Sequence, residues 1–128
     1  MNFSSDYLEF ALGKSCERLG SDYIDLYQLH NPPIQLVKDG RIFKSLEKFK
    51  ASGKIRHYGI SIHDPPEGLL AMRDRELGAI QVAFNILRQE AKNQLFGEAT
   101  KNSVGVIARE PLANGFLAGR RKAESSFL

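Results

Sequence analysis

Side chains that could do chemistry recur directly after apolar runs of this sequence. His30 ends one such run and precedes Asn31, Pro32 and Pro33, and two prolines cannot continue a strand. An imidazole in that place can donate a hydrogen bond or exchange a proton near neutral pH, although an isolated histidine is more often structural. Other polar or aromatic side chains follow the later apolar runs: Ser61, His63, Phe84, Asn85, Arg109 and Glu110.

The histidines and the cysteine show no metal-binding pattern. His30, His57 and His63 have no partner set at ligand spacing, so we expect no metal site. The lone Cys16 falls on an apolar helical stripe, where packing is the expected role, and it cannot form an internal disulfide. Cysteine usage of this kind suits a reducing compartment, and we expect a cytoplasmic protein.

Composition bounds the class of protein. The chain has 128 residues, of which 42% are hydrophobic and 26% charged, which suits one ordinary domain, and we predict a single domain over residues 1–128. The net charge of +3 comes from scattered lysines and arginines and gives no reason to propose nucleic acid as a partner. We expect no association with a membrane, because no stretch approaches a spanning length.

The elements that must position these side chains alternate between helix and strand. Helical spacing of apolar residues begins after Ser4 and stops at Gly20, and a second amphipathic pattern with Ile42, Phe43, Leu46 and Phe49 stops at Gly53. A third helix begins at Asp64, with Leu69, Leu70 and Met72 as its expected buried stripe, and a fourth contains Leu95, Phe96 and Ala99. The predicted strands cover residues 23–30, 55–62, 79–84 and 104–108, and a proline-bearing loop is expected after the first.

Each interval between strands has room for one crossover helix, so all four strands should be parallel. Four such units fit an open flavodoxin-like sheet or part of a (β/α)8 barrel, and periodicity does not choose between them. Both folds bind ligands at the carboxyl ends of the strands. We therefore expect the side chains that follow the strands to converge on one face.

Several segments together resemble one known family. They are RLGSDYIDLYQLH at 18–30, GKIRHYGIS at 53–61, QVAFN at 81–85 and GVIAREPLANGFLAG at 105–119. The sequence resembles the aldo-keto reductases, which are (β/α)8 barrels that use NADPH to reduce aldehydes and ketones. The likeness runs from the helix before the fourth barrel strand to just beyond the seventh. It implies an α/β fold of parallel βα repeats, a partial TIM barrel or half-barrel with four strands.

The resemblance also implies roles for five residues. His30 would be catalytic, because it would orient the substrate carbonyl and hydrogen-bond its oxygen as negative charge develops there. Ser61 and Gln81 match positions that bind the nicotinamide carboxamide of NADPH, and Arg109 stands where an aromatic residue often stacks on the nicotinamide. Leu112 matches the loop that wraps the pyrophosphate.

The sequence departs from the family pattern in three places. The family's proton-donor tyrosine and its lysine and aspartate partners have no counterpart among these residues. The usual Ser-Asn pair reads Ser61-Ile62, so one partner for the carboxamide is absent. Glu110 replaces a small polar residue near the pyrophosphate, where a carboxylate is unfavourable unless it pairs with a cation.

Four strands of a closed barrel leave two unpaired edges and an uncovered interior, which favours pairing with something else. Three outcomes follow: the remaining half of a longer reductase, a homodimer that closes eight strands, or an open module without activity. The functional hypotheses are therefore carbonyl reduction of a small substrate with NADPH, and a catalytically inactive binding or assembly module.

Overall fold

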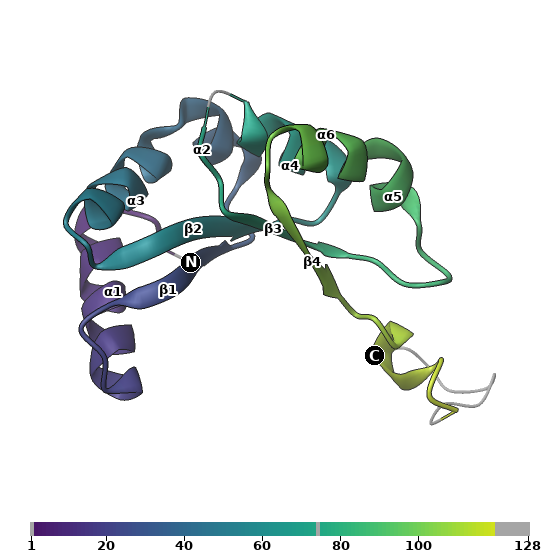
Figure 1. The fold of residues 1–128 in the computed structure, drawn as a ribbon, viewed down its shortest axis with the longest axis horizontal. Coiled ribbons are helices and arrows are strands. Elements are labelled where there is room, and N and C mark those ends of the chain that lie inside the picture. Colours follow the sequence, from purple (N-terminus) through teal and green to yellow (C-terminus); the bar gives the residue numbers. More distant parts are fainter. Residues whose placement is uncertain (1, 74, 120–128) are drawn as a thin grey trace.

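A computed structural model describes residues 2–73 and 75–119, in which helices and strands alternate (Figure 1). The strands are β1 (Ile24–His30), β2 (Ile55–Ser61), β3 (Ala79–Ala83) and β4 (Gly105–Arg109). The helices are α1 (Ser5–Leu19), α2 (Ile34–Asp39), α3 (Arg41–Ala51), α4 (Pro65–Met72), α5 (Glu90–Gln94) and α6 (Phe96–Lys101), and a short 3₁₀ helix, η1 (Ala113–Gly115), follows β4.

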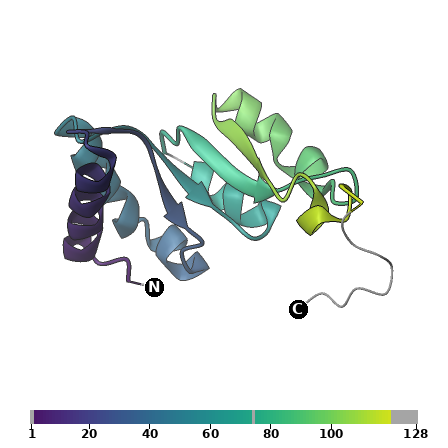
Figure 2. The same cartoon turned by 90° about the horizontal axis from the view of Figure 1, so that it is seen from below.

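The four strands form one parallel sheet whose order, β1-β2-β3-β4, follows the chain. Figure 1 shows α2 to α6 arching over one face of the sheet, and Figure 2 looks onto the other face. A flavodoxin-like sheet would have a non-sequential strand order and helices on both faces. The arrangement is that of consecutive units of a (β/α)8 barrel, which decides between the two folds that periodicity left open.

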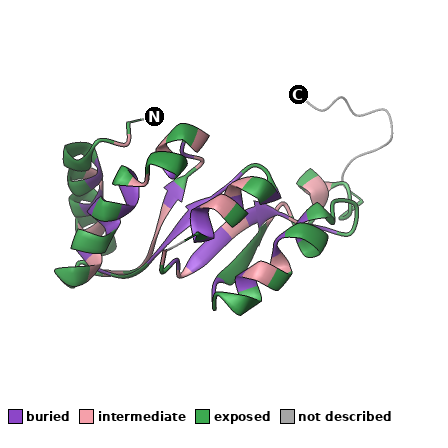
Figure 3. Cartoon of the chain, turned by 90° about the horizontal axis from the view of Figure 1, so that it is seen from above, coloured by how far each residue is buried: buried purple, intermediate pink, exposed green. Residues whose placement is uncertain are grey.

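The core lies between the sheet and these helices (Figure 3). Leu29, Ile60 and Ile80 are neighbours in the strand register, and each is at most 2% exposed. Phe43 and Leu46 of α3 and Leu95 at the junction of α5 and α6 belong to the same core cluster. Alternate residues of each strand therefore turn towards the helices, and the remaining ones turn away.

The predicted helix ends of α1 and α4 are confirmed. Ser4 caps α1 by accepting a hydrogen bond from the Tyr7 backbone N–H, and Gly20 ends the helix in the left-handed conformation. At α4, Asp64 and Glu67 form a reciprocal capping box around Pro65. The partly buried Cys16 packs against the core, as expected for its place on the apolar stripe of α1.

The structure corrects the expected buried stripe of α4. Leu69 is 37% exposed and Leu70 is only half-buried, whereas Gly68, Ala71 and Met72 are buried. A Cβ atom on Gly68 would lie 2.8 Å from side-chain atoms of both Ile62 and Leu95. The helix therefore approaches its neighbours on its small-residue side, which turns Leu69 outward.

Two further segments differ from expectation. The residues after Pro33 form α2, with Val37 buried, where a loop was predicted. The helix expected around Leu95 is divided into α5 and α6, which meet at that residue.

Within residues 2–73 and 75–119, no helix has the length and apolar character needed to cross a membrane.

Candidate functional site at the carboxyl ends of the strands

Three of the predicted site residues form one row across the sheet. His30 of β1 is paired in register with Ser61 of β2, and Ser61 is paired with Gln81 of β3. Neighbouring strands are about 4.8 Å apart, so the Cα atoms of His30 and Gln81 are roughly 10 Å apart. The parallel register thus brings these side chains together at the carboxyl ends of β1 and β2.

This row lies on the face of the sheet that turns away from α2 to α6. Leu29, Ile60 and Ile80, which alternate with the row residues along the strands, are buried under the helices. We call the opposite face the inner face, because it faces the interior of a barrel. On it Ser61 is 4% exposed, Gln81 is half-buried and His30 is exposed.

The His30 ring contacts the next residue along the chain. Its Nε2 atom is 3.3 Å from Nδ2 of Asn31. An amide nitrogen donates, so this contact is a hydrogen bond when Nε2 is the accepting nitrogen of the ring. The Asn31 backbone N–H in turn donates to the Ser61 carbonyl oxygen at 3.1 Å, which ties the end of β1 to that of β2.

Arg109 lies on the same face, one inner-face position further along than the row. It is paired with Ala83, whereas Gln81 is paired with Ile107. Its Nη1 atom is 3.2 Å from Oε1 of Glu110, and its Nε atom is buried without a hydrogen-bond partner among the described residues. Glu110 therefore pairs with a cation, the arrangement that makes a carboxylate tolerable near a phosphate.

Asn85 holds the segment that carries Arg109 and Glu110. Its Nδ2 atom donates to the Glu110 carbonyl oxygen at 3.0 Å, and its Oδ1 atom accepts from the backbone N–H groups of Leu87 and Arg88. Asn85 is 8% exposed, so these bonds are largely shielded from water. The predicted convergence of the β3 and β4 ends is confirmed here, with Asn85 in a supporting role.

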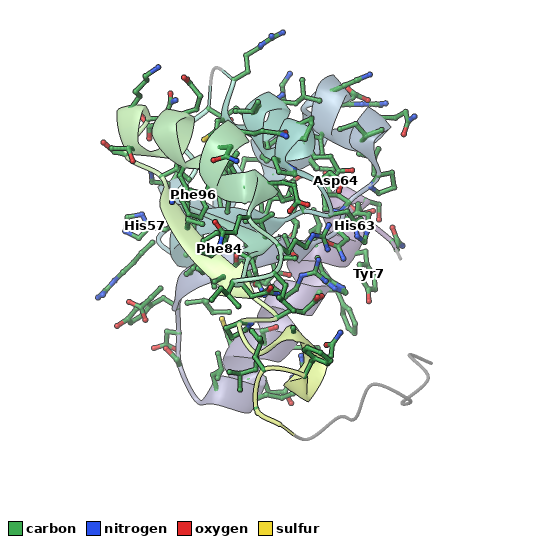
Figure 4. The ribbon with its side chains drawn as sticks, turned by 90° about the vertical axis from the view of Figure 1, so that its right-hand side faces the viewer. Tyr7, His57, His63, Asp64, Phe84 and Phe96 are labelled. Atoms are coloured by element: carbon green, nitrogen blue, oxygen red, sulfur yellow. The ribbon has the colours of Figure 1, made fainter. Side chains whose placement is uncertain are left out.

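Other residues expected to converge do not join the inner face. His63 lies two residues beyond β2, on the opposite side of the view from His57 (Figure 4), and its backbone N–H donates to Glu67 at the start of α4. Phe84 packs edge-on against Phe96 of α6, with ring centroids 4.9 Å apart. Leu112 follows β4 and is 55% exposed, so any contact it makes with a cofactor stays a prediction.

Sequence reasoning missed one residue of the inner face, Gln28. Its Nε2 atom donates to Oε1 of Gln81 at 3.3 Å, across β2. The signal was present in the sequence, because a residue two positions before His30 in a strand shares its face. Apolar neighbours on either side made the run Asp25–Leu29 look like an ordinary strand.

Comparison with known proteins places the chain in one family. The model of the Aldo/keto reductase family matches residues 2–127. The chain is 32% identical over 96% of its length to the uncharacterized oxidoreductase YqkF of Bacillus subtilis, and 31% identical over 99% to the aldo-keto reductase yakc [NADP(+)] of Schizosaccharomyces pombe. It spans 40% and 38% of the lengths of these two relatives.

Solved structures of aldo-keto reductases also superimpose on this chain. The holo form of the aldo-keto reductase AKR11C1 from Bacillus halodurans superimposes with a TM-score of 0.87 at 31% identity, over 99% of this chain and 42% of that one. An aldo/keto reductase from Klebsiella pneumoniae in complex with NADP and acetate gives a TM-score of 0.74 at 28% identity, over 91% of this chain and 40% of that one. These proteins share the order of parallel βα units found here. The chain belongs to the aldo-keto reductase family and forms part of its barrel.

Proposed function

We propose that this chain forms the carbonyl-binding and nicotinamide-binding part of an NADPH-dependent reductase of small aldehydes or ketones. The observation that carries the proposal is the row of His30, Ser61 and Gln81 on the inner face, with Arg109 one position beyond it. A cytoplasmic location, as cysteine usage suggests, is part of the same proposal.

The inner face suits the nicotinamide end of NADPH. Its carboxamide needs one hydrogen-bond donor and one acceptor, and a serine hydroxyl beside a glutamine amide can supply both. Arg109 adds a planar cation whose buried Nε atom lacks a partner among the described residues. NADPH, when bound, supplies the hydride that reduces the carbonyl carbon.

The chain's own residues would then orient the nicotinamide and stabilise the charge that develops on the substrate oxygen. Ser61 and Gln81 fix which face of the nicotinamide ring is presented. His30 donates a hydrogen bond to the substrate oxygen, where negative charge develops as the carbonyl carbon is reduced. Arg109 stacks on or beside the nicotinamide while it neutralises Glu110.

The tyrosines favour binding without turnover as the second candidate function. Tyr27 and Tyr58 alternate with the inner-face residues and turn towards the helices, and the Tyr58 ring lies 6.3 Å from that of Phe43 in α3. Tyr7 lies on α1 and Tyr23 precedes β1. None of the four is on the inner face, so the proton that completes reduction must come from elsewhere.

We propose that further barrel strands complete this site. Within the described residues, β1 and β4 each pair with one strand only, and both Val106 and Ile107 of β4 are 36% exposed. The remaining strands of a reductase barrel would cover these edges, as would a second copy whose β1 pairs with β4 of the first. A twofold axis along the barrel allows that pairing twice, because all strands stay parallel.

Titration with NADPH, followed by nicotinamide fluorescence, tests the binding part of the proposal. We expect saturable binding that Ser61→Ala and Gln81→Leu each weaken by about 3- to 10-fold, the effect of one lost hydrogen bond. His57→Asn is the control, because His57 lies on the inner face at the amino end of β2, two positions before Gly59. No saturable binding would contradict the proposal.

Turnover and solution mass separate the candidates. Oxidation of NADPH in the presence of a small aldehyde, lost in His30→Phe and kept in His57→Asn, would support reduction. Binding without turnover would support the inactive module and trace the defect to the absent proton donor. Light scattering tests closure by two copies, and a monomer that binds NADPH at high dilution would remove the homodimer.

A further inference from the structure

The inner face carries a second amide, Gln28, that the proposed cofactor site does not use. Gln28 lies two residues before His30 on β1, in register with Gly59, and Gly59 is in register with Ala79. This is the layer directly below the row of His30, Ser61 and Gln81. Gln28 nevertheless reaches Gln81, two strands away, with its Nε2 atom 3.3 Å from the Gln81 Oε1 atom.

Gly59 makes this reach possible. A Cβ atom at Gly59 would lie 3.2 Å from Cγ of Gln28 and 2.6 Å from the carbonyl oxygen of Ala79. The strand between the two glutamines therefore has no side chain on the inner face at this layer. The Gln28 side chain crosses β2 through the space so left.

In this structure the contact orients the Gln81 amide with its oxygen towards Gln28. A glutamine side chain has an accepting oxygen and a donating nitrogen, and here the oxygen receives the Gln28 hydrogen bond. The nitrogen is then the end that Gln81 can present to a ligand. Without Gln28, rotation of the amide by half a turn would exchange the two ends.

Among the described residues, the Gln28 amide has one polar atom without a hydrogen-bond partner. Its Oε1 atom is buried and has no hydrogen-bond partner among the described residues. Buried polar atoms are nearly always hydrogen-bonded, so an unpartnered one calls for an explanation beyond packing. The only side-chain hydrogen bond of Gln28 among the described residues is the one to Gln81.

We propose that Gln28 is a positioning residue that makes Gln81 a hydrogen-bond donor to the carboxamide oxygen of the nicotinamide. This inference rests on the proposed cofactor site. It predicts that the protein reads the carboxamide oxygen at Gln81 rather than the carboxamide nitrogen. Two analogues separate these possibilities: thionicotinamide-NADP⁺, in which sulfur replaces the oxygen, and 3-acetylpyridine-NADP⁺, in which a methyl group replaces the nitrogen.

The experiment compares the affinities of NADP⁺ and the two analogues for the wild-type chain and three variants. We expect the wild type to bind the thionicotinamide analogue about 3- to 10-fold more weakly than NADP⁺, which is the effect of one weakened hydrogen bond. Gln28→Met should remove most of this difference, because Gln81 is free to rotate. Gln35→Met, the same change at an exposed position of α2, should leave it unchanged.

A second variant tests the direction of the hydrogen bond. In Gln28→Glu the carboxylate can only accept, so Gln81 should turn its nitrogen towards position 28 and its oxygen towards the ligand. Discrimination should then move to the acetylpyridine analogue, which should bind about 3- to 10-fold more weakly than NADP⁺. Circular dichroism checks that each variant is folded.

The outcomes separate the two proposals. A wild type that binds none of the three dinucleotides overturns the cofactor site and this inference with it. A wild type that binds them, with the same discrimination in Gln28→Met, overturns only the role of Gln28. If both Gln28 variants fail to fold, Gln28 is structural and the inference is wrong. Loss of discrimination in Gln28→Met and its transfer in Gln28→Glu support it.

Discussion

The two faces of this sheet differ in what their side chains do. Under the helices, the register row of Leu29, Ile60 and Ile80 is apolar and buried. On the inner face, the equivalent row is His30, Ser61 and Gln81, and the layer below contains Gly59. Because alternate residues of a strand point to opposite faces, the residues that stabilise the core and those of the candidate site lie on different faces of the same strands. Substitutions on the two faces should therefore have different consequences.

The largest expected effect is on the helix-covered face. Ile80→Ala should lower the free energy of unfolding by about 2–5 kcal/mol, because Ile80 is fully buried and its removal leaves a cavity. Ile107→Ala is the matched control on the inner face, where the side chain is 36% exposed, and it should cost less than half as much. Urea denaturation measures both. Equal losses would show that the two faces contribute alike.

A smaller loss of stability is expected at Gly59, where the inner face has no room for a side chain. Gly59→Ala places a Cβ atom 2.6 Å from the backbone oxygen of Ala79, so β2 and β3 must move apart. We expect a cost of about 1–3 kcal/mol, as for other overpacked sites. Gly13→Ala in α1 is the control, since nothing lies within 4 Å of its new Cβ atom. That change should stabilise the helix by about 0.5–1 kcal/mol.

Sequence patterns predicted the elements that carry their own signals. The helix α1 and the capping box of α4 have local caps, and each strand is an apolar run between turn residues, so these were found. On α4 the burial of Met72 was predicted correctly, but Leu69 was wrongly placed in the core, because it is apolar while Gly68 is the residue that packs closely against Ile62 and Leu95. How closely α4 approaches its neighbours depends on residues distant in the sequence, such as Leu95, so the local pattern of apolar residues does not predict it.

The candidate site was predictable only in part. His30, Ser61 and Arg109 close or follow apolar runs, and the parallel register brings them to the inner face. The contact of Gln28 with Gln81 joins residues 53 positions apart and depends on the space at Gly59. To predict this contact, one needs the register of β1 with β2 and that of β2 with β3, and the local sequence pattern gives neither.

Tyr58, on the helix-covered face, should make stability fall at high pH. Burial raises the pKa of Tyr58 above the ordinary value of 10.0, with Glu47 and Glu76 adding to the effect. Above that pH the unfolded chain loses the tyrosine proton more readily than the folded chain, so the free energy of unfolding decreases as pH rises. Urea denaturation at several pH values from about 9 to 11 should show this decrease, and Tyr58→Phe should make it shallower. An unchanged slope in the variant would contradict the prediction.

The smallest effect on stability is expected at the end of β4, where a change should act on binding instead. Glu110→Gln breaks a half-exposed ion pair with Arg109, which is worth about 0–1 kcal/mol. It also removes a carboxylate from the neighbourhood proposed for the pyrophosphate and frees the guanidinium. NADPH should therefore bind more tightly, and the gain should shrink as salt is added. Glu98→Gln on α6, which breaks an exposed pair with Lys101, controls for the change in net charge. An equal gain in both variants would mean that NADPH responds to the overall charge of the protein, and the position of Glu110 would then carry no information about the path of the cofactor.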